Sequence, residues 1–255
     1  MQTMVPLYGF GGVPYSAVRK AAPRNLLDNS DFTNLVAQAG IGGNHGTIAY
    51  AADRWILDSG TVSYEAGVGL TLNGTIRQKL EFPPTGETSA FVGMASGAAS
   101  ISYADGEVTI TSGGGVLKWA ALYGGVYTET TKPEYQPKGY GAELAECQRY
   151  YYTIKSDGLN YAAYATGTMN TASSAYFPIL FPIPMRTIPT FFYSGSFRVY
   201  VNGAGRPVTS IGINAPSRYT VRMSVGGISS GVSEQACELQ SSNDGTAFIA
   251  FSADL

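Results

Sequence analysis

Apolar and polar positions alternate in short runs along most of the chain, and glycine, proline or asparagine separates one run from the next. The clearest run is 75–82, in which every second side chain belongs to one face: Ile76, Gln78, Leu80 and Phe82. An alternation with period two is typical of a strand with one buried face. Because turn signals recur roughly every 8 to 12 residues, the pattern predicts an all-β fold of the sandwich kind.

The expected strands spread over both halves of the chain. In the first half they are 61–65, 69–72, 75–82, 90–95, 100–103, 107–111 and 116–123. In the second half they are 161–167, 175–181, 190–193, 197–201, 208–213, 219–225, 236–239 and 246–253. Asn73-Gly74 predicts a two-residue hairpin turn between two of them. The prolines within residues 178–189 predict an edge strand or a crossover, because proline cannot donate to a sheet ladder.

One stretch, residues 143–154 (ELAECQRYYYTI), departs from this pattern. Helix formers come first and an aromatic, β-branched run follows, which predicts a short helix leading into a strand. In that strand Tyr150 and Tyr152 should face one side and Tyr151 the other. The stretch therefore divides the chain into a leader or attachment segment (1–24), a jelly-roll-like β-sandwich (25–142), a helix-strand connector (143–156) and a C-terminal β-sandwich (157–255).

Composition excludes two classes of partner from the prediction. Charged residues make up 13% of the 255 residues and the net charge is -2, with no basic run to bind a phosphate backbone, so nucleic acid is not expected. No apolar stretch approaches the roughly 18 residues of a membrane helix, so no membrane insertion is expected. Cys147 and Cys237 are expected to be free, buried thiols, because a lone pair is not a disulfide framework.

The polar residues give no catalytic signature. His45 is the single histidine and lies in a glycine-rich loop, so no zinc site or proton relay can be completed with a second one. Glycine clusters at 40–46 and 113–115 lack the residues that follow a phosphate-binding loop and are interpreted as turns. Glycoside cleavage needs two carboxyl groups, and no local pattern singles out a pair among the candidates: Asp53, Asp58, Glu65, Glu81, Glu87, Asp105, Glu107, Glu129 and Glu134.

Aromatic side chains are the positive signal, since the chain has 18 tyrosines. A sugar ring can lie on an exposed aromatic ring while nearby polar groups bind its hydroxyls. Core or subunit packing is the alternative role for each tyrosine. Trp55 is expected in the core, with Arg54 paired to Asp53 or Asp58. The candidate glycan-binding residues are Tyr103, Trp119, Tyr123, Tyr127, Tyr161, Tyr164, Tyr176, Tyr193 and Tyr200.

Oxygen ligands cluster at the start of the first sandwich, and calcium is the one cofactor that they suggest, since calcium prefers oxygen ligands. The candidate ligands are Asn25, Asp28 and Asp31, with Asn29 between them. The alternative is that these side chains only cap turns at a strand entrance.

Several segments resemble a known family. VPLYGFGG, NLLDNSDFTN…ADRW, GTIRQKLE, ELAECQRYYY, FPIPMRTIPT and NDGTAFIAFSADL together resemble tail-fibre and receptor-binding proteins of bacteriophages and prophages of gut Firmicutes. The NLLDNSDF start is also similar to jelly-roll carbohydrate-binding modules. The resemblance implies a virion (phage tail) protein that assembles as a homotrimer in the bacterial host cytoplasm. It also implies attachment to other phage tail proteins through the N-terminal leader and binding to bacterial surface polysaccharide.

Three functions stay open at this point. The first is a receptor-binding or adhesion protein that recognises bacterial cell-surface glycans without catalysis. The second is a structural tail or baseplate component without a ligand of its own, in which the tyrosines form subunit interfaces. The third is a glycan-cleaving tail enzyme.

Overall fold

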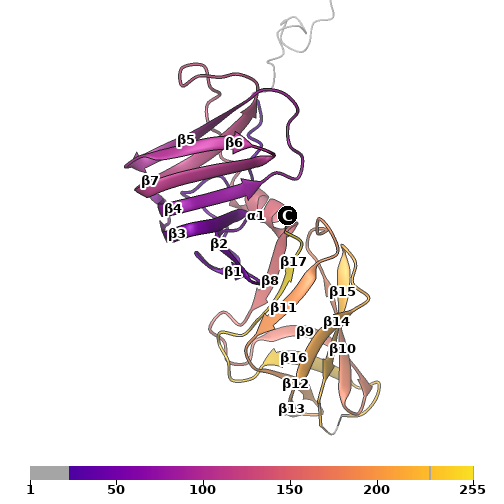
Figure 1. Ribbon diagram of the computed structural model, residues 1–255. Helices are drawn as coiled ribbons and strands as arrows, with labels where there is room; N and C mark the ends of the chain where they lie inside the picture. The colour runs from indigo at the N-terminus through magenta and orange to yellow at the C-terminus, as the bar shows by residue number, and fades with distance from the viewer. Residues whose placement is uncertain (1–22, 230, 255) are drawn as a thin grey trace, which may run out of the picture.

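The computed structural model describes residues 23–229 and 231–254, so nearly all of the predicted leader lies outside the described residues. The strands form two groups with one helix, α1 (Tyr140–Gln148), between them (Figure 1). The predicted all-β class with a short connecting helix is confirmed. We call residues 23–139 the first half and residues 150–254 the second half.

The first half contains a single seven-stranded antiparallel sheet. Its longest strand is β7, which pairs with β4 on one side and with β5 and β6, placed end to end, on the other. Beyond the start of β4 at Gly69, the chain up to Asp31 takes the place of β4, with backbone hydrogen bonds to the last part of β7. The strands are β1 (Asn44–His45), β2 (Ile48–Ala52), β3 (Trp55–Glu65), β4 (Gly69–Lys79), β5 (Thr88–Ser96), β6 (Ala99–Ala104) and β7 (Glu107–Gly124).

The second layer of the first half is made of loop rather than of a second sheet. Leu27, Phe32 and Leu35 from the long segment before β1 bury themselves against Leu72 and Ile76 of β4, in one core cluster. Burial of these side chains stabilises the half by roughly 1.5–3 kcal/mol each. The first half is therefore one sheet with a loop packed on one of its faces.

The predicted Asn73-Gly74 hairpin is wrong, because β4 runs straight through these residues. The register between β4 and β7 shifts here because Gly114 is an extra residue in β7, between the partners of Leu72 and Asn73. Gly74 has φ 145° and faces Gly60, and a Cβ added at Gly74 would lie 2.0 Å from the carbonyl oxygen of Ser59. The glycine is needed for close approach of two strands instead of for a turn.

Helix α1 buries a different face from the one that its apolar residues suggest. Glu143 and Cys147 are the buried positions, while Leu144 is half-buried. Both cysteines are free and buried, as predicted. Tyr150 lies in the turn after the helix, so Tyr150 and Tyr151 both pack towards the first half and only Tyr152 belongs to the core of the second half.

The second half contains two sheets around one core. The larger has the order β13-β12-β16-β9-β10-β15-β14, and the smaller has the order β11-β17-β8. Phe177, Val199 and Leu239 from the larger sheet and Phe251 from the smaller belong to one buried cluster. The strands are β8 (Tyr151–Lys155), β9 (Ala163–Thr171), β10 (Ser174–Leu180), β11 (Thr190–Ser194), β12 (Phe197–Val201), β13 (Ala204–Pro207), β14 (Ser210–Asn214), β15 (Thr220–Gly226), β16 (Ala236–Ser241) and β17 (Phe248–Ser252).

The proline-rich segment crosses between these two sheets, in agreement with one of the two alternatives. Residues 181–189 connect β10 of the larger sheet with β11 of the smaller one. Pro178 lies inside β10, an interior strand, but β9 pairs with β10 only as far as Tyr176. The missing N–H of Pro178 therefore disrupts no ladder on that side.

Candidate functional site

The structure divides the nine predicted aromatic residues by exposure. Tyr161, Tyr193 and Tyr200 are 51%, 42% and 40% exposed, whereas Tyr123 and Tyr164 are 2% and 7% exposed. The last two belong to the core, which corrects their predicted role as sugar platforms. The remaining ones are half-buried: Tyr103, Trp119, Tyr127 and Tyr176.

Trp119 is held on both sides by the first half itself. Its ring stacks on that of Tyr135 with 4.9 Å between centroids and 8° between planes. Gly93 lies opposite Trp119 on β5, and a Cβ added there would come within 2.2 Å of the indole. Lys132 Nζ lies 5.3 Å from the centroid of the same ring. Trp119 is therefore a packing residue, with little open ring surface for a sugar.

Three of the predicted tyrosines come together on the outer side of the larger sheet of the second half. We call this surface the arginine–tyrosine face. Register places Tyr200, Glu238 and Thr166 opposite one another on β12, β16 and β9, and it places Tyr176, Thr168 and Ala236 opposite one another on β10, β9 and β16. The face consists of Tyr161, Thr166, Thr168, Tyr176, Arg198, Tyr200, Arg222, Glu238 and Gln240.

Arg198 lies between two tyrosine rings at one end of this face. Its guanidinium carbon is 4.1 Å from the ring centroid of Tyr161 and 5.8 Å from that of Tyr200. Its Nε and Nη2 donate to Gln240 Oε1 at 2.9 and 2.7 Å. Gly205 on the neighbouring strand leaves room for the side chain, because a Cβ there would lie 2.7 Å from Arg198 Cδ.

Arg222 forms a second unit of the same kind on the other side of β9. Its guanidinium carbon lies 4.5 Å from the centroid of the Tyr176 ring, and its Nε donates to Asn214 Oδ1 at 2.6 Å. A hollow of about 570 Å³ opens beside this unit. It is lined by Thr166, Gly167, Thr168, Tyr176, Pro178, Arg222 and Ala236.

Neither arginine of the face is neutralised by a carboxylate. The arginine ion pairs found within residues 23–229 and 231–254 involve Arg24, Arg54, Arg77 and Arg149 instead. Glu238 is the acidic side chain of the face, and it accepts from Gln240 Nε2 at 2.6 Å. Two guanidinium groups thus retain donors for an incoming ligand.

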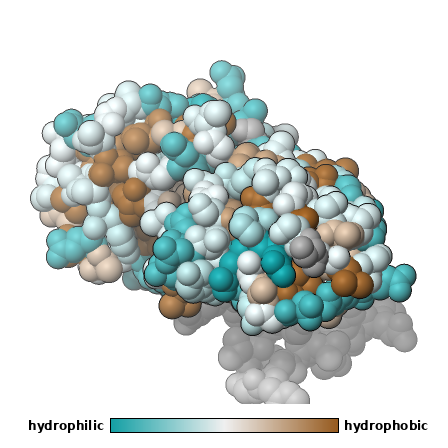
Figure 2. All heavy atoms as spheres, turned by 90° about the horizontal axis from the view of Figure 1, so that it is seen from below, coloured by the Kyte–Doolittle hydropathy of each residue, from teal (hydrophilic) through white to brown (hydrophobic). Residues whose placement is uncertain are grey.

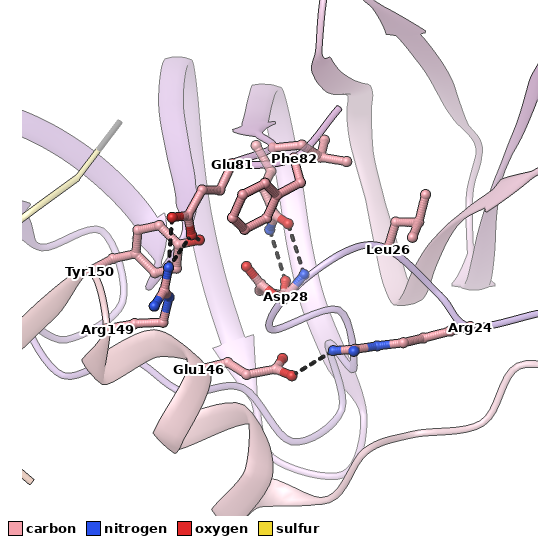
Figure 3. Close-up of a pocket in the computed structure, with 10 residues that line it drawn as sticks. Arg24, Leu26, Asp28, Glu81, Phe82, Glu146, Arg149 and Tyr150 are labelled. Carbon is pink, nitrogen blue, oxygen red and sulfur yellow. Dashed lines mark hydrogen bonds and ion pairs between the residues drawn. The ribbon is translucent and has the colours of Figure 1, made fainter. Parts of the chain in front are cut away.

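A second hollow, of about 360 Å³, lies where α1 meets the first sheet (Figure 3). Arg149 Nη2 donates to both carboxylate oxygens of Glu81 at 2.6 Å, and Tyr150 Oη donates to Glu81 Oε2 at 2.8 Å. Arg24 pairs with Glu146 at 3.0 Å. Phe82 stands at the rim with 79% of its surface exposed, because the chain leaves the strand before it.

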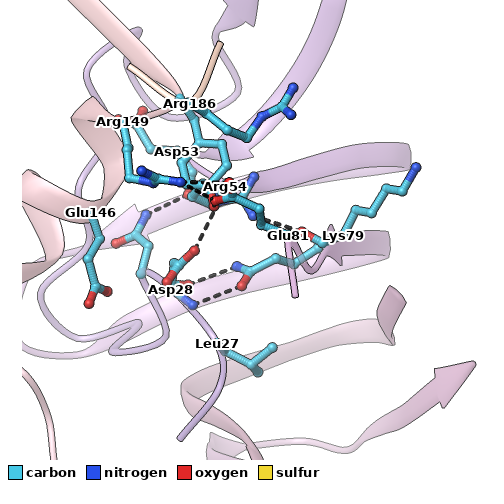
Figure 4. A network of polar contacts seen from close by, with 12 residues as sticks. Leu27, Asp28, Asp53, Arg54, Lys79, Glu81, Glu146, Arg149 and Arg186 are labelled. Carbon is cyan, nitrogen blue, oxygen red and sulfur yellow. Dashed lines mark hydrogen bonds and ion pairs between the residues drawn. The ribbon is translucent and has the colours of Figure 1, made fainter. Parts of the chain in front are cut away.

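The charges of this second hollow are satisfied by one another (Figure 4). Arg54 is buried; it pairs with Asp28 at 3.2 Å, donates to the carbonyl of Lys79 at 2.7 Å and stacks 3.6 Å from the Tyr150 ring centroid. The prediction that Arg54 pairs with Asp53 or Asp58 is therefore wrong. Burial alone would raise the pKa of Glu81, but hydrogen bonds from Arg149 and Tyr150 outweigh it and lower that pKa. The hollow is a structural joint whose groups already have partners.

The predicted calcium ligands are used in turns and ion pairs. Asn25 Nδ2 donates to Ser30 Oγ and its Oδ1 accepts from Leu27 N, while Asp31 Oδ1 accepts from Thr33 N. Asp28 pairs with Arg54 and Lys138. In the part of the chain that the structure describes, no three His, Cys, Asp or Glu side chains are grouped to hold a metal ion. The turn-capping alternative accounts for Asn25 and Asp31, whereas Asp28 is used in ion pairs.

His45 is not the surface loop residue that its glycine-rich setting suggests. It is 4% exposed and lies between the rings of Tyr50 and Tyr151. Trp55 is fully buried, as predicted, and its Nε1 donates to the carbonyl of Asn29 at 2.9 Å.

Comparison with known protein families, with curated proteins and with solved structures finds no match to this chain. Among residues 23–229 and 231–254, no helix has the length and apolar character to cross a membrane. Apolar groups on the face seen in Figure 2 form separate brown patches between hydrophilic areas.

Sequence reasoning found the tyrosines of the arginine–tyrosine face and missed its arginines. Arg198 and Tyr200 alternate with buried Phe197, Val199 and Val201, and Arg222 alternates with Val221 and Met223 in the same way. This alternation identifies both arginines as outward-facing. That they share one face depends on strand order, which the local pattern does not contain.

Proposed function

We propose that this chain is a carbohydrate-binding protein that recognises glycans through the arginine–tyrosine face and does not cleave them. The observation that supports this most directly is the pair of stacked arginine–tyrosine units, Arg198 with Tyr161 and Arg222 with Tyr176, on the outside of one sheet. Neither guanidinium has a carboxylate partner in the described residues, unlike Arg54 and Arg149.

The chemistry of the face matches a sugar that carries acidic groups. A tyrosine ring offers an apolar surface with a polar tip, which suits the apolar side of a pyranose. A guanidinium donates in a fork that fits carboxylate and phosphate oxygens. Thr166 and Thr168 add hydroxyl groups beside the hollow at Tyr176. Arg198 and Arg222 are four strand spacings apart in the sheet order, or roughly 19 Å, so one extended glycan would reach both.

We propose binding without cleavage because the face lacks a pair of carboxyl groups. Glycosidases of the common kinds place two of them roughly 5 to 10 Å apart around the scissile bond. Glu238 stands without a second acidic residue on the face, and its Oε2 accepts from Gln240.

The setting of this binding is proposed from the sequence resemblance. In this setting the chain is a receptor-binding protein of a phage tail, and its ligand is bacterial surface polysaccharide. It assembles as a homotrimer that is joined to other tail proteins through its N-terminal leader. A structural tail component without a ligand is the competing proposal. The tyrosines of the face would then form an interface with other subunits.

Glycan binding by purified protein tests the proposal. The full chain is titrated with acidic and neutral bacterial polysaccharides. Tyr176→Ala and Arg222→Ala should each weaken binding of the acidic one roughly tenfold, since stacking and charge contacts of this kind contribute about 1–2 kcal/mol. Tyr140→Ala, which changes a 47% exposed tyrosine on α1, serves as the matched control.

Two results would contradict glycan binding at this face. One is the absence of binding to any polysaccharide of a broad panel. The other is equal loss in Tyr140→Ala and Tyr176→Ala. A tail component without a ligand predicts instead that Arg222→Ala changes the mass of the assembled particle or its subunit stoichiometry, measured by light scattering, while no glycan binds. Release of reducing ends from a polysaccharide would show cleavage.

A further inference from the structure

The two halves meet around a stack of three rings. His45 of β1 lies between Tyr50 of β2 and Tyr151 of β8, with ring centroids 3.9 and 3.7 Å apart and planes inclined by 16° and 6°. Tyr50 and His45 belong to the first half and Tyr151 to the second. The three side chains are buried, so bulk water is kept from the imidazole.

Two buried carboxylates face the two nitrogens of this imidazole. Asp254, in the second half, places Oδ2 2.8 Å from Nδ1, and Asp53, in the first half, places Oδ1 3.6 Å from Nε2. Both carboxylates are held in place. Ser252 Oγ donates to Asp254 Oδ2 at 2.9 Å, and Gln38 Nε2 donates to Asp53 Oδ2 at 2.7 Å. His45 is thus a bridge between one carboxylate from each half.

The protonated imidazole suits this arrangement better than the neutral one. A neutral ring has one N–H and can donate to one carboxylate only, whereas an imidazolium has two. Removing the charge would leave two buried carboxylates without a cation between them, which is costly. The faces of Tyr50 and Tyr151 also attract a cation.

The other charged groups near the imidazole do not replace it. Burial raises the pKa of Tyr50 and raises that of Tyr151 to about 12, so both phenols stay neutral. Arg186 donates to the backbone carbonyls of Ala253 and Asp254, and Arg54 is paired with Asp28. His45 therefore supplies the charge that both carboxylates share.

We propose that His45 is a pH-sensitive latch that holds the two halves together as an imidazolium and loosens the joint when it loses its proton, while the contacts of Tyr150 with Glu81 and Arg54 remain. The latch consists of His45, Asp53 and Asp254. Release would leave Asp53 and Asp254 repelling each other across the joint and would let the arginine–tyrosine face change its orientation relative to the first half. The latch does not depend on what that face binds.

The direction of the pH effect follows from the surroundings of the ring. Burial by itself lowers the pKa of His45, but the hydrogen bond with Asp254 and the negative charges of Asp254 and Asp53 outweigh it and raise that pKa above the ordinary 6.5. The stabilisation is therefore complete below pH 6.5 and is lost as the pH rises through the raised value. Few other side chains titrate there, since burial raises the thiol pKa of Cys147 and raises that of Cys237 to about 11.

The test uses the full chain and its single histidine, whose NMR signal needs no assignment. Between about pH 6 and pH 9, a range that brackets an imidazole with a raised pKa, the midpoint of this signal should lie above 6.5 in the folded protein. Asp254→Asn should shift the midpoint downwards. Glu87→Gln, which changes an exposed carboxylate elsewhere, should leave it in place.

Two further measurements separate a latch from a local contact. The free energy of unfolding should fall as the pH rises in the wild type and should lose this slope in His45→Gln. The radius of gyration from X-ray scattering should rise over the same range in the wild type and should be large at every pH in His45→Gln. A midpoint at or below 6.5, an unchanged slope in His45→Gln, or a radius that is constant in both proteins would each overturn the latch.

Discussion

The joint between the halves and the arginine–tyrosine face both contain an arginine stacked on a tyrosine, but the two pairs have different roles. At the joint, Arg54 stacks on Tyr150 and pairs with Asp28, and it is 4% exposed. On the face, Arg222 stacks on Tyr176, but its partner is the amide of Asn214. One guanidinium is neutralised inside the protein, and the other keeps its charge towards solvent.

The comparison shows that a stacked arginine and tyrosine do not by themselves indicate a binding site. The presence or absence of a carboxylate partner of the arginine distinguishes a structural pair from a binding pair. Where Asp28 or Glu81 accompanies the arginine, the unit joins parts of the chain and its removal should cost stability. Where no carboxylate accompanies it, removal should cost ligand binding. This distinction can be tested in both regions.

The largest effect on stability is expected from Arg54→Ala. The substitution leaves the half-buried carboxylate of Asp28 and the carbonyl of Lys79 without their buried donor and removes the stack on Tyr150. Hydrogen bonds to charged groups contribute about 1.5–3 kcal/mol each. Arg222→Ala should change the free energy of unfolding by less than about 0.5 kcal/mol, as surface substitutions usually do. Urea denaturation measures both. An equal loss of unfolding free energy in the two variants would contradict the different roles of the two regions.

A smaller effect, with its own pH dependence, is expected from Glu81→Gln. The variant weakens the bonds from Arg149 and Tyr150, and hydrogen bonds to charged groups contribute about 1.5–3 kcal/mol. Because the pKa of Glu81 is lowered from 4.5, this stabilisation is present above pH 4.5 and is lost as the pH falls through the lowered value. The difference between wild type and variant should shrink from about pH 7 to about pH 3; a constant difference would contradict the assigned role.

The smallest effect on stability, and a clear one on binding, is expected from Asn214→Asp. It places a carboxylate beside Arg222 and so gives the open unit the partner that the joint has. An exposed ion pair changes stability by about 0–1 kcal/mol, whereas affinity for an acidic glycan should fall roughly tenfold. Asn214→Ala is the control, because it removes the amide without adding a charge. Equal affinity of the Asn214→Asp and Asn214→Ala variants for the acidic glycan would contradict a role for the charge of Arg222 in binding.

Period-two alternation was sufficient to predict the fold class, and the same local pattern marks Tyr176 and Tyr200 as outward-facing, since each alternates with buried neighbours. The same reasoning failed at Asn73-Gly74, where a sequence that favours a turn instead continues a strand, with Gly74 opposite Gly60. Glycine serves either purpose, the close approach of two strands or a hairpin turn. Whether the glycine forms a turn or approaches another strand depends on β3, whose pairing with these residues cannot be seen in the local sequence.

The joint could not be predicted from local pattern for a related reason. His45 and Asp254 are 209 positions apart, and nothing near either residue indicates the other. Glycines around His45 favour a loop, but His45 lies in the short strand β1, against which Tyr151 of the second half stacks. The buried position of Glu143 in α1 is similar, since its partners are the backbone N–H groups of Asn29 and Ser30 more than a hundred residues away.

The pairing of β8 with β17 bears on how the chain reaches this structure. Tyr151 of β8 lies opposite Ser252 of β17, so the first and last strands of the second half are hydrogen-bonded neighbours. Closing so long a loop costs entropy before any contact rewards it, and such topologies fold slowly. During synthesis the second half must therefore wait for β17 to leave the ribosome, while β1 to β7 have all their partners as soon as Gly124 has emerged. The first half should thus acquire its structure first and offer the second a finished surface on which to fold.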